Sequence, residues 1–217
     1  MAEKNTIVFV IDDDSSVRKS LSRLLRSIRH SVETFSSAEE FLARERFDGI
    51  GCILLDVQMP GLSGMDLQAE LSKAETSMPI VFITGHGDIP MSVEAMRKGA
   101  VHFLIKPFDS NDLLAAVSEA IEKDRRAKAE QAEIRNIRRR LSLLTPREYE
   151  ILRYVTTGML NKQIAFTLNI AEKTVKIHRG RVMEKLCVNS VAELVRLAEK
   201  IRIELPRIKQ SSVVGQA

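Results

Sequence analysis

Six polar side chains in the first half of the chain share one position: each lies at the end of an apolar, β-branched run or directly after it. They are Asp12, Asp13, Asp14, Asp56, Thr84 and Lys106. Crowded carboxylates repel one another unless a cation lies among them, and Mg²⁺ prefers such oxygen ligands. A carboxylate beside a metal ion can attack a phosphoryl group, while a lysine neutralises the transferring oxygens. These residue types therefore predict phosphoryl chemistry, provided that the fold brings them together.

The combination carries this prediction, because each residue alone has a simpler explanation. A single Asp after a strand is usually a turn or capping residue. Asp14 precedes an amphipathic segment, and we expect it to cap that helix rather than to bind a ligand.

The elements that must position these residues alternate along the chain. Continuous apolar runs are typical of strands buried on both faces, and segments with apolar residues at every third or fourth position are typical of helices. The predicted strands are residues 6–11, 32–35, 52–55, 79–83 and 101–105. Helices are predicted around residues 17–28, around Phe41 and Leu42, and at residues 65–74, 91–98 and 110–122. This alternation predicts a parallel sheet with helices on both faces and functional groups at the carboxyl ends of the strands.

The charge of the chain is divided between its halves. Residues 1–122 contain 12 Lys and Arg against 19 Asp and Glu, a net charge of −7, whereas residues 123–217 contain 21 against 10, a net charge of +11. An acidic half joined to a basic half indicates two domains with different partners. The basic half is the candidate for binding a polyanion such as DNA.

Several classes of protein are not expected. Hydrophobic residues make up 44% of the chain, too many for a disordered protein. No apolar run approaches the roughly 20 residues that span a bilayer, and residues 1–6 lack the features of a signal peptide, so we expect a cytoplasmic protein without membrane contact. Cys52 and Cys187 are isolated, which predicts neither a disulfide framework nor a zinc site, and we expect both to be buried and reduced.

A charged segment without Pro or Gly joins the two halves, from Glu122 to the residue before Pro146. Apolar residues recur at helical spacing on both sides of it, which predicts a long helix with coiled-coil character near its end. A solvated, partly frayed linker is the alternative. The expected division is residues 1–123 for the first domain, 124–140 for a helical linker, 141–203 for the second domain and 204–217 for a disordered tail.

The second domain is predicted to be entirely helical. Thr145-Pro-Arg-Glu148 and Ser190-Val-Ala-Glu193 have the pattern of capping boxes, which open helices. Between them, a short helix at residues 161–168 and a longer helix at residues 172–186 are separated by a tight turn. The longer helix has a basic face and an apolar face, which is typical of the second helix of a DNA-binding helix-turn-helix. A basic, solvated surface helix is the alternative.

The motifs of the first domain resemble the receiver domain of bacterial two-component response regulators, over about residues 5–123. These motifs are Val10-Ile-Asp-Asp-Asp14, Leu55-Asp-Val-Gln-Met-Pro-Gly61, Ile83-Thr84 and Lys106-Pro-Phe108. The resemblance implies a flavodoxin-like (βα)₅ fold, Mg²⁺ as the cofactor and a sensor histidine kinase as the partner that phosphorylates Asp56.

The same resemblance implies a set of metal ligands. Asp13 and Asp56 would bind Mg²⁺ directly, with the backbone carbonyl of Gln58 as a third ligand. Asp12 would act through water. The alternative from another class is an aspartyl phosphotransferase of the haloacid-dehalogenase type, which would need a second Asp two residues after the nucleophile. The chain has Gln58 at that position, which argues against such an enzyme.

The resemblance further implies a switch. Thr84 would be the switch hydroxyl, Lys106 the partner of the phosphoryl group and Phe103 the aromatic ring that rotates. A cis peptide bond is implied between Lys106 and Pro107, and cis bonds are largely a proline feature. Spacing alone would place Phe103 in the core.

The second domain, over about residues 141–200, resembles the four-helix DNA-binding domain of LuxR-type regulators of the FixJ/NarL family. The motifs are Leu144-Thr-Pro-Arg-Glu148, Gly158, Asn161-Lys-Gln-Ile-Ala165, Ile170-Ala, Thr174-Val-Lys-Ile-His178 and Met183-Glu-Lys-Leu186. Residues 85–91 and 161–164 resemble the FixJ and StyR-like branch in particular. The resemblance implies that the DNA contacts are Asn161, Lys162, Lys173, Thr174, Lys176, Ile177 and Arg179.

Two further features of the second domain follow from the resemblance. Gly180 departs from relatives that carry a larger polar side chain there, and a helical Gly costs roughly 0.5–1 kcal/mol relative to Ala. The last helix, at residues 192–197, would form a dimer surface.

We expect phosphorylation of Asp56 to promote dimerisation and promoter binding, in a protein that regulates transcription and is not an enzyme. RNA polymerase is then a further partner. A regulator that ignores phosphorylation is the alternative, and the intact set of pocket residues argues against it. This mechanism is a two-state switch that a local change of charge biases.

Overall fold

Two compact units, residues 1–129 and 130–217, make up the chain, and the computed structural model describes residues 6–74, 78–85 and 89–206. The strands are β1 (Thr6–Ile11), β2 (Ser31–Phe35), β3 (Ile50–Asp56), β4 (Ile80–Thr84) and β5 (His102–Ile105). The helices are α1 (Ser15–Ser27), α2 (Ala38–Leu42), α3 (Gly64–Lys73), α4 (Ile89–Arg97), α5 (Ser110–Leu141), α6 (Pro146–Thr156), α7 (Asn161–Leu168), α8 (Glu172–Leu186) and α9 (Val191–Lys200).

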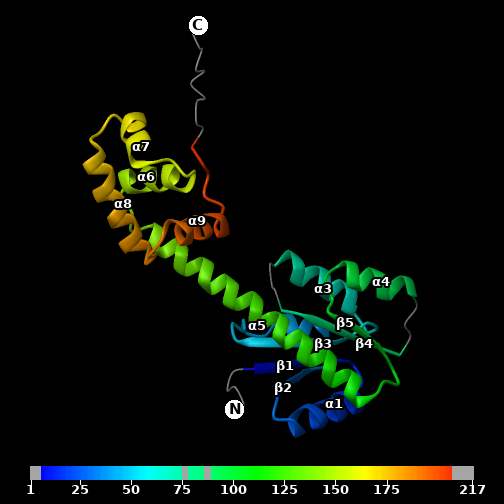
Figure 1. The fold of residues 1–217 in the computed structure, drawn as a ribbon. Coiled ribbons are helices and arrows are strands. Elements are labelled where there is room, and N and C mark those ends of the chain that lie inside the picture. Colours follow the sequence, from blue (N-terminus) through cyan, green and yellow to red (C-terminus); the bar gives the residue numbers. More distant parts are fainter. Residues whose placement is uncertain (1–5, 75–77, 86–88, 207–217) are drawn as a thin grey trace. The chain divides into compact units, whose positions relative to one another are not determined.

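The first unit is built on a parallel sheet with the strand order β2-β1-β3-β4-β5 (Figure 1). β1, β3 and β4 are buried along nearly their whole length, as continuous apolar runs predict. The expected α/β fold is therefore confirmed. The order reverses at β1, so the crevice at the carboxyl ends of β1 and β3 is where ligands bind in such sheets.

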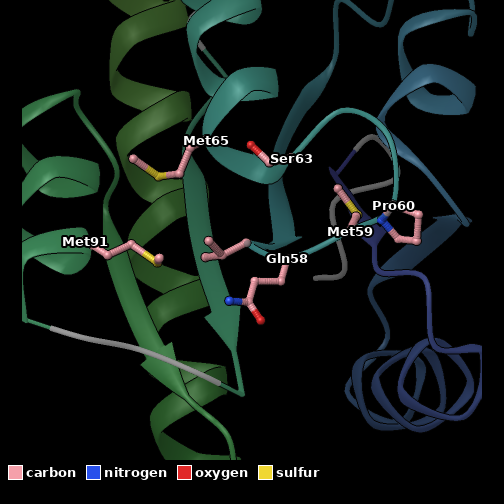
Figure 2. A pocket seen from close by; sticks show the side chains of 7 residues that line it. Gln58, Met59, Pro60, Ser63, Met65 and Met91 are labelled. Atoms are coloured by element: carbon pink, nitrogen blue, oxygen red, sulfur yellow. The ribbon is translucent and has the colours of Figure 1, made fainter.

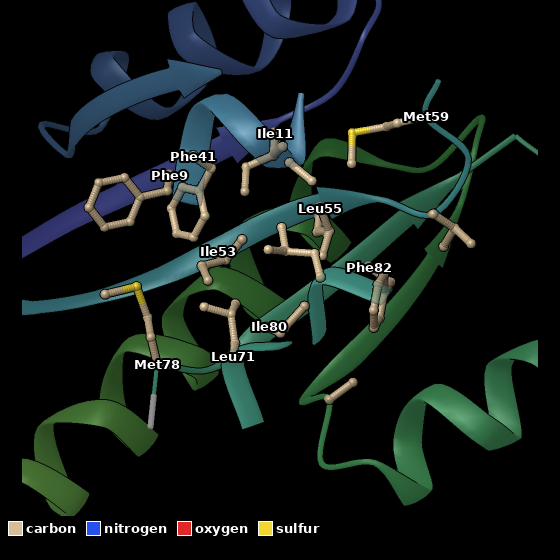
Figure 3. Close-up of a cluster of buried hydrophobic side chains, with 14 of the residues drawn as sticks. Phe9, Ile11, Phe41, Ile53, Leu55, Met59, Leu71, Met78, Ile80 and Phe82 are labelled. Carbon is tan, nitrogen blue, oxygen red and sulfur yellow. The ribbon is translucent and has the colours of Figure 1, made fainter. Parts of the chain in front are cut away.

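Helices cover both faces of this sheet. One face packs against α1 and α5 through residues such as Leu25 and Leu113, both fully buried. The other face packs against α2, α3 and α4. Figure 3 shows part of this second cluster, in which Phe41 of α2 meets the ring of Phe9 edge to face, with centroids 5.6 Å apart. Both cores hold the strands in one register, which is what positions the strand ends.

A single helix, α5, continues out of the first unit, so the predicted long helix is confirmed. Its Asp124 side chain is fully buried and accepts hydrogen bonds from the Gly51 backbone N–H at 2.8 Å and from the Lys128 ammonium at 2.7 Å. Lys128 also donates to the Gly49 carbonyl. These contacts fix α5 to the beginning of β3. The domain boundaries expected from the sequence, and self-association through this helix, stay predictions.

The second unit is the expected helical domain. It is formed by α6 to α9, which follow the end of α5 along the chain. Its core includes Ile151, Ile164, Val175, Leu186 and Leu194, all fully buried. Each of these helices contributes at least one of these side chains, so the hydrophobic effect holds them together as one core.

Glu148 links the start of α6 to the end of α8. It closes a capping box with Thr145, whose N–H donates to Glu148 Oε2 at 2.9 Å, as the sequence predicts. The same oxygen accepts a hydrogen bond from the Lys185 ammonium at 2.6 Å, and the Glu148 side chain is 2% exposed. The hydrogen bond from Lys185 and that from the Thr145 N–H lower the pKa of Glu148.

The second predicted capping box is formed only in part. Ser190 accepts a hydrogen bond from the Glu193 N–H at 3.1 Å, as expected. The Glu193 carboxylate, however, accepts from the N–H of Asn189 at 2.8 Å, one residue before the cap. Both bonds satisfy N–H groups at the start of α9, where no helical partner exists.

The expectation for the cysteines is confirmed for Cys52 and wrong for Cys187. Cys52 lies within β3 and is fully buried, and burial raises the pKa of its thiol to about 12. Cys187 is exposed, because it ends α8 in the left-handed conformation, at φ 52°, and so leaves the apolar face of that helix.

The structure describes only the first three residues of the predicted tail. Residues 204–206 form no regular element, and residues 207–217 of the predicted disordered tail lie outside the described residues. Across the described parts of the chain, every helix is too short or too polar to cross a bilayer.

Replacing Glu148 by Gln keeps the size of the side chain but removes the charge that binds Lys185. We expect the free energy of unfolding of the second unit at neutral pH to fall by about 1–2 kcal/mol, since charge-assisted hydrogen bonds to a buried group are weakened. The pKa of Glu148 is lower in the folded protein than in the unfolded chain. Its contribution is therefore present above the unfolded pKa and is lost as the pH falls through the folded pKa. The difference between variant and wild type should shrink below about pH 4.

Urea denaturation followed by tyrosine fluorescence measures this effect, because both tyrosines of the chain, Tyr149 and Tyr154, lie on α6. The control is Glu150→Gln on the same helix, whose ion pair with Arg147 is more exposed. It should change the free energy of unfolding by less than about 0.5 kcal/mol. Equal effects of the two substitutions would contradict the role given to Glu148.

Candidate functional site

The register of the sheet brings the predicted pocket residues to one edge. Ile11 lies opposite Leu55, so Asp12 and Asp56 leave neighbouring strands at the same level. Asp56 in turn lies opposite Ile83, one residue before Thr84. Thr84 lies opposite Ile105, and the Lys106 N–H donates to the Thr84 carbonyl at 2.7 Å. The four functional side chains therefore come from adjacent strand ends.

One ammonium joins two carboxylates in this pocket. Lys106 Nζ lies 2.7 Å from Asp12 Oδ2 and 2.9 Å from Asp56 Oδ2. The Asp12 side chain is 2% exposed and the Asp56 side chain 10%. The second oxygen of each is also bonded, because Asp12 Oδ1 accepts from the Asp14 N–H at 2.8 Å and Asp56 Oδ1 from the Gln58 N–H at 3.1 Å. The pocket is therefore preorganised around negative charge.

Burial and charge act in opposite directions on these groups. Burial raises the pKa of Asp12, and the nearby charge of Asp56 adds to this, whereas Lys106 and the Asp14 N–H favour the ionised form. Burial lowers the pKa of Lys106, but its hydrogen bonds to Asp12 and Asp56 outweigh burial, so the pKa of Lys106 is raised. The lysine therefore stays charged at neutral pH.

The residues fit a divalent metal ion by position and by chemistry. Asp12, Asp13 and Asp56 can each offer a carboxylate oxygen, and these oxygens lie within 4.8 Å of one another. Asp13 is exposed whereas Asp12 and Asp56 are buried, so the cluster opens to solvent on one side. An all-oxygen set with room for water suits Mg²⁺. Asp14, in contrast, caps α1 by accepting the Ser16 N–H at 2.7 Å, as expected.

The predicted switch residues lie on β4 and β5, the strands next to β3. Thr84 is fully buried at the end of β4. Phe103 on β5 is half-buried and faces Phe82, with ring centroids 6.2 Å apart and planes 46° apart. The peptide bond between Lys106 and Pro107 is cis, as the resemblance implies. Residues 86–88, in the segment after Thr84, lie outside the described residues.

A hollow of about 460 Å³ lies beside the loop that follows Asp56 (Figure 2). The side chains that line it are those of Val57, Gln58, Met59, Pro60, Ser63, Met65 and Met91. Met65 comes from α3 and Met91 from α4, and both pack against the same core as Phe103. Methionine side chains adapt readily to a change of shape. Two of the side chains that line this hollow are therefore of a flexible type.

The predicted DNA contacts gather on α7 and α8 of the second unit. Lys162, Lys173, Lys176 and Ile177 are exposed, and Ile177 keeps 48% of its surface accessible. The buried residues of α8 are Val175, Val182 and Leu186. α8 thus has the two faces that the sequence predicts.

The remaining predicted contacts are half-buried, namely Asn161, Thr174 and Arg179. The Arg179 guanidinium donates to Asn161 Oδ1 at 2.9 Å, which ties α8 to the first residue of α7. Lys185 belongs to the same basic helix, but it binds Glu148 and the Leu143 carbonyl and so serves the core rather than the exposed face.

Sequence reasoning missed two residues that shape the pocket. Gly64 begins α3 against the acceptor strand, and a Cβ atom there would lie 2.2 Å from the Asp56 carbonyl oxygen. Arg18 of α1 donates to the Asp12 carbonyl at 2.5 Å. A glycine at the start of a helix close to the acceptor was a usable signal for the first. Arg18 had none, because its partner is a backbone atom.

Comparison with known proteins accounts for both units. The family "Response regulator receiver domain" matches residues 8–118, and the family "Bacterial regulatory proteins, luxR family" matches residues 142–198. Nodulation protein W of Bradyrhizobium diazoefficiens is 46% identical over 212 residues, which cover 98% of this chain and 93% of that protein. Transcriptional regulatory protein FixJ of the same organism is 40% identical over 191 residues, which cover 88% of this chain and 93% of that protein.

Among solved structures, that of the response regulator StyR superposes with a TM-score of 0.82 at 46% identity, and the match covers 90% of this chain and 99% of that one. Because one family matches each compact unit and the relatives match nearly the whole chain, the chain belongs to the two-component response regulators that join a receiver domain to a LuxR-type DNA-binding domain and regulate transcription.

Proposed function

We propose that Asp56 accepts a phosphoryl group from a sensor histidine kinase and thereby controls binding of the second unit to promoter DNA. The observation that carries this proposal is the contact of the Lys106 ammonium with the carboxylates of both Asp12 and Asp56, at 2.7 and 2.9 Å. A cation fixed at that place can neutralise phosphoryl oxygens that arrive at Asp56.

Mg²⁺ is the proposed cofactor. Asp13, Asp56 and the Gln58 carbonyl would bind it directly and Asp12 through water, a set supported by the carboxylate oxygens that lie within 4.8 Å of one another. Bound Mg²⁺ would offset the negative charge of the carboxylates and of the transferring oxygens. In the transfer itself, a bond forms between an Asp56 carboxylate oxygen and phosphorus while the bond from phosphorus to the kinase's histidine nitrogen breaks. Lys106 then donates its N–H groups to the phosphoryl oxygens.

The kinase is proposed to dock on a groove next to this pocket. The groove has a volume of about 480 Å³ and lies between α1 and the segment that follows β5. Val17, Leu24 and Phe108 give it an apolar wall, and Lys106 and Pro107 form its edge. A partner that covers this groove has direct access to Asp56 and excludes water from the reacting groups.

The response is proposed to pass through Thr84 and Phe103 to the surface of α4. Phosphoryl oxygens on Asp56 would draw the Thr84 hydroxyl toward them, and Phe103 would turn into the space that this leaves. On the neighbouring surface, Ile89 is 80% exposed and Ile105 is 52% exposed. Exposed apolar side chains of this kind support dimerisation of the phosphorylated receivers.

The second unit is proposed to read DNA with α8 in a major groove. Lys173, Thr174, Lys176, Ile177 and Arg179 would face the DNA, and Asn161 and Lys162 would contact phosphates. A dimer, with α9 as part of its surface, would place two such helices on a two-fold operator. RNA polymerase is the proposed further partner, and a protein with this role acts in the bacterial cytoplasm. The regulatory family of the chain favours a role without an enzymatic product.

Asp56→Asn tests the proposal, because it removes the nucleophilic carboxylate at nearly unchanged size. We expect wild-type protein treated with acetyl phosphate and Mg²⁺ to gain one phosphoryl group by intact-mass spectrometry and to dimerise in sedimentation velocity. The variant should do neither. The control is Asp48→Asn, an exposed carboxylate outside the pocket, which should behave as wild type. Unchanged phosphorylation of the Asp56 variant would overturn the proposal.

Lys106→Met removes the cation of the pocket and leaves its carboxylates. We expect Mg²⁺ to bind about three- to tenfold more tightly, because the ion no longer competes with an ammonium for the same negative charge. We also expect phosphorylation by acetyl phosphate to slow by about tenfold or more, because a donor to the phosphoryl oxygens is lost. Isothermal titration with Mg²⁺ and phosphorylation kinetics measure the two effects. Lys98→Met, on the surface at the end of α4, is the matched control. Weaker Mg²⁺ binding would contradict the arrangement.

Lys173→Ala tests the DNA face. We expect binding of duplex DNA to weaken and the slope of log K against log salt concentration to fall by about one, since one phosphate contact releases about one counterion. Lys123→Ala removes an equal charge from an exposed position of the first unit and should leave the slope unchanged. Fluorescence anisotropy over a range of salt concentrations gives both slopes. Equal slopes for the two variants would exclude Lys173 from the interface.

A further inference from the structure

We propose that the groove between α1 and β2 binds a small polyanion that carries two or more phosphate groups. The groove has a volume of about 600 Å³. It is lined by the cationic side chains of Arg18, Lys19, Arg23 and Arg26, and by three hydroxyl groups, including that of Ser22. Guanidinium groups and hydroxyls together are the donors that bind phosphate oxygens in proteins.

The charge of this groove runs against that of its domain. Residues 1–122 carry a net charge of −7, yet five of their 12 cationic side chains lie within residues 18–29. α1 contains four cations and no carboxylate. Positive charge is thus clustered at α1, although the net charge of the whole domain is negative.

Among the described residues, none of the four cations has a carboxylate as an ion-pair partner, and two of them lack a hydrogen bond as well. Lys19 and Arg23 make no ion pair or hydrogen bond with any of the described residues, although they lie four positions apart on one helix face. Like charges at this spacing destabilise a helix. A bound polyanion would offset this repulsion. Its binding would therefore stabilise α1.

The other two cations are held in place by backbone atoms. Arg18 donates to the Asp12 carbonyl at 2.5 Å, and Arg26 donates to the Val32 carbonyl at 3.1 Å. Each guanidinium has five N–H donors, so such a bond orients the group and leaves donors for a ligand. The carboxylate of Glu40 is close enough to feel the charge of Arg18, but it is bonded to Ser36.

The shape of the site favours a small ligand over an extended partner. The other groups that line the groove are short hydroxyl side chains, and that of Ser22 is buried. The groove proposed for the kinase lies on another face of α1 and has the apolar lining of Val17, Leu21 and Leu24. The two sites therefore differ in both position and chemistry.

Hydrogen exchange of the full-length protein with sodium tripolyphosphate, in the absence of Mg²⁺, tests this inference. The readout by peptide separates this groove from the basic helix α8, which also attracts polyanions. We expect tripolyphosphate to protect peptides within residues 15–34. In the double variant Lys19→Ser/Arg23→Ser, the concentration for half-maximal protection of these peptides should rise by about 10- to 100-fold. Protection confined to residues 161–185 would overturn the proposal.

Matched variants separate a specific site from bulk charge. Lys73→Ser/Arg97→Ser removes two exposed cations from α3 and α4 and should leave the protection of residues 15–34 unchanged. Lys19→Arg/Arg23→Lys keeps both charges and should retain the protection. An equal loss in all three double variants would overturn the proposal. So would stronger protection by an oligoglutamate peptide of equal charge, because the groove would then be a docking surface for an acidic protein.

Discussion

The arrangement of the receiver depends on one ammonium held between two carboxylates that come from different strands. Lys106 reaches Asp12 and Asp56 only because β1, β3, β4 and β5 are parallel and in register at their carboxyl ends. A shift of one residue in any of these strands would turn its terminal side chain to the other face of the sheet. Burial of the two carboxylates is tolerated because each is hydrogen-bonded and paired with the lysine, which itself is 24% exposed. The hydrophobic cores on both faces thus serve the pocket by fixing the register.

In both units, buried carboxylates are stabilised by the same kinds of partner. Asp56 and Asp12 bind a lysine and backbone N–H groups, and Glu148 binds Lys185 and the N–H of Thr145. The outcomes differ because of the second acidic partner. Two carboxylates compete for one lysine in the receiver, which leaves excess negative charge for a cation and for chemistry. Glu148 has its lysine alone, and the pair is purely structural. The receiver pocket thus holds more carboxylates than cations, whereas Glu148 and Lys185 form a one-to-one pair.

Sequence predicted most of the fold and most of the pocket because both depend on local patterns. The apolar runs gave the strands to within two residues, and Asp14 was expected as the cap of α1, where it accepts the Ser16 N–H. What sequence did not show were contacts between a side chain and a distant backbone atom. Asp124, in a segment expected to be a charged linker, is buried against Gly51, and Arg18 binds the Asp12 carbonyl. Neither contact leaves a periodicity or a motif. Cys187 was misplaced for a related reason, because the left-handed residue after α8 breaks the helical spacing.

β3 connects two charged contacts at opposite ends of one buried strand. Its last residue is Asp56, bonded to Lys106, and near its first residues the Gly51 N–H is bonded to Asp124 of α5. Lys128, one turn further along α5, binds both Asp124 and the Gly49 carbonyl. A strand packed on both faces does not stretch. The contacts of Gly49 and Gly51 with α5 therefore resist a displacement of β3 at its Asp56 end. The helix that leaves the receiver is thereby fixed to the same strand that ends at Asp56.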